Sequence, residues 1–126
     1  NDDAKWDWYV IGGRYAGRLR LKDKTQEAYL YYPDLPRLYD REELEHLKKL
    51  KAEGYCDQAR VKDISNLSEI SCFAVVKDGK WYEQGKMGWW GVVTGRKDPD
   101  EWEAELKKLL ENLPPDTLLT MFDCHI

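Results

Sequence analysis

The sequence predicts an α+β domain of the ferredoxin-like (βαββαβ) class, a mainly antiparallel sheet with two helices on one face. Segments with strand and helix patterns follow in the order strand, helix, strand, strand, helix, strand. Both helical segments begin with capping residues, and an Asp-Gly pair at 78–79 is typical of the tight turn of a hairpin. A chain of 126 residues is long enough for one core, so a single domain over 1–126 is expected.

The first strand is expected over 17–21, where leucines alternate with charged residues, and it can begin as early as Trp8. The segment 25–39 that follows is rich in tyrosine and contains two prolines. Prolines together with aromatic residues that can pack predict an ordered loop or an extended excursion over this segment.

Two helices are predicted from their ends. Asp40 can cap the first helix, with Glu43 three residues later, and Gly54 predicts its end. Asp98 can cap the second helix, with Pro99 at its first position, and a proline pair marks where it stops. Apolar residues recur on one face of each segment, as expected of helices that pack on a sheet.

The remaining strands are predicted around the hairpin signal. One strand is expected over 70–77, and its return strand begins at 80–83 and is bulged or split by glycines before 92–94. The last strand is expected over 117–126, and its apolar content predicts a central place in the sheet. The segment 55–68 is consistent with a short helix or a turn.

Composition narrows the class of protein. The net charge of −4 argues against a protein that coats DNA, since such proteins are usually basic. Six Trp and eight Tyr against two Phe favour binding platforms, with core filling as the alternative. Three cysteines without a CxxC pair, and no secretory segment, predict a reducing, cytoplasmic compartment. No apolar run reaches the length of a membrane span.

The opening segment 6–18 is the first candidate site, because it combines aromatic residues, a glycine pair and arginines. Glycines expose backbone N–H groups, and an arginine fork can hold phosphate or carboxylate. No Walker loop or dinucleotide fingerprint is present. The alternative is a β-bulge or tight turn with Arg14 paired to Asp7. The candidate ligand-binding residues are Trp6, Trp8, Gly12, Gly13, Arg14, Arg18 and Trp89.

Two weaker candidates lie further along the chain. Trp89, between glycines in the segment 87–91, can stack on a base or an apolar partner, or cover a sheet edge. Asp123 and His125 would share one face of a strand, where they can bind a metal or act as an acid–base pair. No ligand spacing supports a metal site, and the alternative is that Asp123 pairs with a buried arginine.

Four segments of the chain form a specific combination of motifs: Lys5–Arg14 (KWDWYVIGGR), Gly79–Glu83 (GKWYE), Met87–Gly91 (MGWWG) and Asp123–Ile126 (DCHI). This combination resembles a family of uncharacterised bacteriophage and prophage proteins. The resemblance implies a phage or mobile-element origin, and a further N-terminal element that is not part of this chain. It implies no activity and no catalytic residues.

These observations predict a non-enzymatic, phage-type accessory protein of the host-cell cytoplasm. The expected ligand is a nucleotide, a short nucleic acid or another phosphorylated molecule, bound through the aromatic, glycine and arginine residues. Two alternatives stay open: a protein that inhibits a host enzyme or defence complex, and a small metal-dependent hydrolase or nuclease built on Asp123 and His125. No cofactor is expected, and neither membranes nor long duplex DNA are expected partners.

Overall fold

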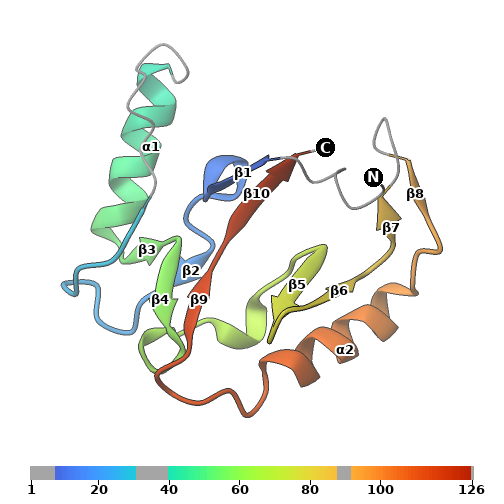
Figure 1. Ribbon diagram of the computed structural model, residues 1–126. Coiled ribbons are helices and arrows are strands. Elements are labelled where there is room, and N and C mark those ends of the chain that lie inside the picture. Colours follow the sequence, from blue (N-terminus) through green and yellow to red (C-terminus); the bar gives the residue numbers. More distant parts are fainter. Residues whose placement is uncertain (1–7, 31–39, 88–91, 126) are drawn as a thin grey trace.

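In the part of the chain that the structure describes, short antiparallel strand pairs and two helices form the fold (Figure 1). The computed structural model describes residues 8–30, 40–87 and 92–125. The helices are α1 (Arg41–Ala52) and α2 (Pro99–Leu110), with 3-10 turns η2 (Gly13–Tyr15), η4 (Val61–Asp63) and η5 (Leu67–Glu69). The strands are β1 (Trp8–Ile11), β2 (Leu19–Arg20), β3 (Tyr55–Cys56), β4 (Gln58–Arg60), β5 (Ala74–Lys77), β6 (Lys80–Glu83), β7 (Lys86–Met87), β8 (Val93–Thr94), β9 (Leu118–Thr120) and β10 (Phe122–His125).

The final strand of the chain is shared between two partners (Figure 1). β9 pairs antiparallel with β4, and β10 pairs antiparallel with β1. At the junction, the Met121 N–H donates to the Asp57 carbonyl and the Gly12 N–H donates to the Met121 carbonyl, each at 2.8 Å. The ends of β1 and β4 therefore meet beside Met121, and the predicted strand at the end of the chain is confirmed with one break. Its predicted central place in the sheet is not confirmed, because within the described residues β9 and β10 each pair with a single strand.

The prediction of an α+β fold with antiparallel pairing is confirmed. The ferredoxin-like order is not confirmed, because the described residues form separate two-stranded ladders: β1–β10, β2–β3, β4–β9, β5–β6 and β7–β8. The first strand does not run unbroken from Trp8 to Leu21. Positive φ angles at Gly12, Gly13 and Gly17 turn the backbone out of the strand between β1 and β2.

Both predicted helix starts are confirmed by their caps. The Asp40 carboxylate accepts a hydrogen bond from the Glu43 N–H at 2.8 Å, and the Asp98 carboxylate accepts from the Asp100 N–H at 2.9 Å. Gly54, with φ of +92°, ends the last turn of α1 in the left-handed region. The two starts follow from local chemistry, since each cap satisfies an N–H group that has no partner within the helix. The predicted end of the second helix is wrong, because α2 ends at Leu110, before the proline pair.

Removal of the α1 cap gives a first prediction. Asp40→Ala should lower the free energy of unfolding by about 1 kcal/mol, because the Glu43 N–H loses its acceptor. Urea denaturation measures the change, and Lys48→Ala, an exposed substitution inside α1, is the matched control. An Asp40→Ala protein as stable as the control would show that the cap contributes nothing.

The hairpin signal is also confirmed. Asp78 and Gly79 both have positive φ, 52° and 76°, and they connect β5 to β6 with Lys77 opposite Lys80. Such a turn matches the twist of the two strands. The segment 55–68, by contrast, holds two short strands and two 3-10 turns.

The main buried cluster lies around β2, β3 and β4. Its residues are Leu19, Leu21, Cys56, Ala59 and Ile64. A second buried group comes from α2 and consists of Trp102 and Leu106, about one helical turn apart. The Trp102 indole N–H donates to the Cys72 carbonyl at 2.8 Å. Neither helix of the described part has the length and apolar character that crossing a membrane requires.

Candidate functional site

The loop over residues 12–17, between β1 and β2, is the centre of the candidate site, and we call it the glycine loop. Within it, η2 is closed by a hydrogen bond from the Tyr15 N–H to the Gly12 carbonyl at 2.9 Å. Gly12, Gly13 and Gly17 have φ of +74°, +54° and +76°. Side chains are disfavoured at such angles, so the glycines let the loop fold back sharply.

Two buried carboxylates lie against this loop. Asp57 is 0% exposed and Asp123 is 2% exposed. The Asp57 side chain accepts a hydrogen bond from the Gly17 N–H at 2.7 Å, and the Asp123 side chain accepts from the Arg14 N–H at 3.0 Å. Because buried charges are costly without partners, these hydrogen bonds make the loop part of what stabilises both carboxylates.

The contact leaves no room for a side chain at the glycine pair. A Cβ atom at Gly12 would lie 2.5 Å from Oδ2 of Asp57, and one at Gly13 would lie 2.6 Å from Cβ of Asp123. The glycine pair was predicted to expose backbone N–H groups to a ligand. The close approach that the structure contains is to these two aspartates.

The exposed Arg14 forms an ion pair with the buried Asp123. Its Nε lies 3.0 Å from Oδ2 and its Nη2 lies 2.8 Å from Oδ1. The arginine side chain is 62% exposed and the aspartate side chain 3% exposed. Hydrogen bonding to Asp123 raises the pKa of the Arg14 guanidinium. The sequence predicted a buried arginine beside Asp123, whereas the structure has the exposed Arg14 there. Asp7, the partner predicted for Arg14, lies outside the described residues.

Arginines and tyrosines are stacked on the outside of the loop and of β2. The Arg14 and Arg18 guanidinium carbons lie 5.5 Å and 5.8 Å from the centre of the Tyr15 ring. The Arg20 guanidinium lies 5.3 Å from the Tyr55 ring, its partner across β2 and β3. These distances are typical of cation–π contacts. We call these five residues the arginine–tyrosine surface.

The backbone beneath this surface is fixed. The Asn66 side chain accepts from the Arg20 N–H at 2.8 Å and donates to the Arg18 carbonyl at 3.0 Å. Leu19, between the two arginines, is 1% exposed, so Arg18 and Arg20 point away from the core. In the part of the chain that the structure describes, neither Arg18 nor Arg20 forms an ion pair with an acid.

The structure places the predicted residues as follows. Gly12, Gly13, Arg14 and Arg18 come together in or next to the glycine loop. Trp8 lies in β1 opposite His125 in β10, and the side chains of both lie outside the described part. Trp6 and Trp89 also lie outside the described residues.

Tyr55 and Asp57 are not among the ligand-binding residues predicted from the sequence. Asp57 stands between Cys56 and the polar Gln58, so the local sequence does not mark its carboxylate as buried.

The geometry gives little support to metal binding or acid–base catalysis by Asp123, near the end of the chain. Both carboxylate oxygens of Asp123 accept hydrogen bonds from Arg14. Over residues 8–30, 40–87 and 92–125, no three His, Cys, Asp or Glu side chains are grouped so as to hold a metal. Burial raises the pKa of the Cys56 thiol to about 11, and burial followed by the charge of Asp123 raises that of Cys124, so neither thiol is activated.

Comparisons of the chain with protein-family models, with curated proteins and with solved structures find no match. Function is therefore inferred from the residues of the site and their chemistry.

Proposed function

We propose that this chain is a non-enzymatic, phage-type binding protein that recognises a phosphorylated ligand, a nucleotide or a short nucleic acid, through the arginine–tyrosine surface. The observation that carries this proposal is what surrounds the guanidinium groups of Arg18 and Arg20. Each guanidinium lies over a tyrosine ring, and neither forms an ion pair with an acid in the described part of the chain. Guanidinium groups with open donors are well suited to phosphate, which they can hold through two parallel hydrogen bonds.

The tyrosine rings also restrict the movement of the guanidinium groups before a ligand binds. A guanidinium supported by a ring loses less side-chain freedom when it binds, which favours affinity. Tyr15 is 42% exposed, so its ring is within reach of the ligand. Arg14 adds positive charge, but its Nε and Nη2 already bind Asp123. Arg18 and Arg20 are therefore the direct contacts in this proposal.

Charge limits the size of the ligand. A net charge of −4 gives the chain a weak overall attraction for polyanions. A ligand that lies on a local basic surface suits this distribution better than a long duplex, which needs many phosphate contacts.

The same proposal includes the host-cell cytoplasm as the location of the protein. It also includes a ferredoxin-like arrangement of the strand pairs.

Substitution of the two open arginines tests the proposal. Arg18→Ala and Arg20→Ala should each lower the affinity for adenosine triphosphate and for short oligonucleotides about tenfold, the loss of one charge-assisted contact. Isothermal titration calorimetry measures the affinity. Arg41→Ala is the matched control, because Arg41 is an exposed arginine on α1 that pairs with Glu45. Equal affinities for Arg18→Ala, Arg20→Ala and the control would contradict the proposal.

A protein partner is the second candidate function, and one observation favours it. The rings of Tyr9 and Phe122 meet edge to face at 5.2 Å on β1 and β10, and they are 65% and 42% exposed. Exposed aromatic pairs of this kind are enriched in protein interfaces. Inhibition of a purified host enzyme that is lost in Phe122→Ser and kept in Arg18→Ala would favour this candidate over ligand binding.

A further inference from the structure

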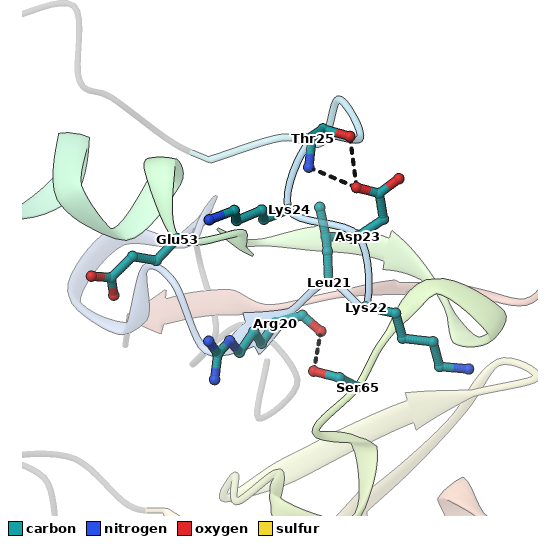
Figure 2. Close-up of a pocket in the computed structure, with 8 residues that line it drawn as sticks. All are labelled: Arg20, Leu21, Lys22, Asp23, Lys24, Thr25, Glu53 and Ser65. Carbon is teal, nitrogen blue, oxygen red and sulfur yellow. Dashed lines mark hydrogen bonds between the residues drawn. The ribbon is translucent and has the colours of Figure 1, made fainter.

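A hollow adjoins the arginine–tyrosine surface and shares Arg20 with it (Figure 2). Figure 2 shows Arg20, Ser65 and Lys22 along one side of this hollow, and Lys24 and Glu53 at the other. The residues that line it are Arg20, Leu21, Lys22, Asp23, Lys24, Thr25, Glu53 and Ser65.

Local hydrogen bonds hold the chain around this hollow. The Lys22 N–H donates to the Asp63 carbonyl at 2.9 Å, and the Ser65 N–H donates to the Arg20 carbonyl at 2.8 Å. The Asp23 carboxylate accepts from the N–H and the hydroxyl of Thr25, at 2.9 Å and 2.6 Å, which lowers its pKa. Asp23 is thus engaged in its own turn and forms no ion pair with the neighbouring lysines.

The basic residues follow one another at every second position from Arg18 to Lys24. Within the described residues, Lys22 and Lys24 form no ion pair either. The chain is extended over β2 and at Leu21, which bridges Ile64, and residues two apart in an extended chain lie roughly 6.6 Å from each other. Glu53 adds a negative charge beside Lys24, so we define the basic path as Arg18, Arg20 and Lys22. These three residues alternate with the buried Leu19 and Leu21 and so face away from the core.

From this arrangement we infer that the ligand is a single-stranded nucleic acid several nucleotides long, which lies across Tyr15, Arg18 and Arg20 and continues to Lys22. The inference rests on the proposed function and specifies its ligand. A mononucleotide carries its phosphates at one end, so it can meet Arg18 and Arg20 but offers no second phosphate, separated by a sugar and a base, for Lys22. A single strand repeats base and phosphate, and its bases can stack on tyrosine rings or on guanidinium planes while its phosphates follow the basic path.

The dependence of affinity on ligand length tests the inference. Fluorescence anisotropy with labelled oligothymidylates of two, four and eight nucleotides should show affinity that rises at least tenfold with length and then levels off. The affinity of the longest ligand should fall with salt, with a slope of about −0.7 for each phosphate contact. Lys22→Ala should weaken binding of the octanucleotide about threefold to tenfold, and Lys48→Ala on α1 should not.

Three results separate this inference from the function on which it rests. If thymidine triphosphate binds as tightly as the octanucleotide and Lys22→Ala matches Lys48→Ala, the single-strand inference is wrong and the proposed function stands. If a duplex of the same length binds as tightly as the single strand, the inference is wrong as well. If neither nucleotides nor oligonucleotides bind the native chain, both are wrong.

Discussion

Replacing Gly13 by alanine is expected to lower the free energy of unfolding by about 2–5 kcal/mol, the sum of backbone strain and overpacking. Its φ of +54° is a left-handed conformation that costs an L residue energy. The new Cβ would lie 2.6 Å from Cβ of Asp123 and 2.9 Å from Cγ2 of Val10, so buried atoms must move. Gly12→Ala should behave alike, because its Cβ would lie 2.8 Å from Cγ of Asp57. Urea denaturation measures both losses.

The control for this prediction is Gly79→Ala. Gly79 has φ of +76°, but a Cβ there would meet no atom within 4 Å. The control therefore carries the backbone strain alone, about 1–2 kcal/mol. If Gly13→Ala and Gly79→Ala destabilise the protein equally, the glycine loop does not lie against Asp57 and Asp123 in the way described.

The helix starts and the β5–β6 turn could be predicted from the sequence because their causes are local. The Asp40 cap, the Asp98 cap and the Asp78-Gly79 turn each depend on residues within a few positions of one another. Propensity and hydrogen bonding over such short distances leave few alternatives. The pairing of strands has no such local cause. That the final strand is shared by β1 and β4 depends on contacts between distant parts of the chain.

The candidate site could be predicted in part for the same reason. The glycine pair, Arg14 and Arg18 were identified because glycine and arginine have distinctive properties wherever they occur. The role of the glycines could not be predicted, since it depends on Asp57 and Asp123, which strand pairing brings to the loop from far along the chain. The cross-strand contact of Arg20 with Tyr55 likewise depends on the register of β2 and β3.

Removing the carboxylate of Asp123 is expected to destabilise the protein by about 3 kcal/mol. The Arg14 N–H and the two guanidinium nitrogens that bind Asp123 all lose an acceptor in Asp123→Ala. Because the Arg14 side chain is 62% exposed, water replaces part of what is lost. Arg14→Ala instead leaves a carboxylate that is 3% exposed without its cation, which is costly because the charge stays buried.

A double-mutant cycle isolates the pair from the rest of the site. With Arg14→Ala already present, Asp123→Ala should cost less than it does alone, and the difference should be about 1.5–3 kcal/mol, the range for hydrogen bonds to charged groups. The exposed pair of Lys62 and Asp116, with its atoms 2.9 Å apart, is the control cycle. Its coupling should be close to zero, because water surrounds both side chains. Equal coupling in the two cycles would mean that burial of Asp123 gives the Arg14 contact no advantage over a surface ion pair.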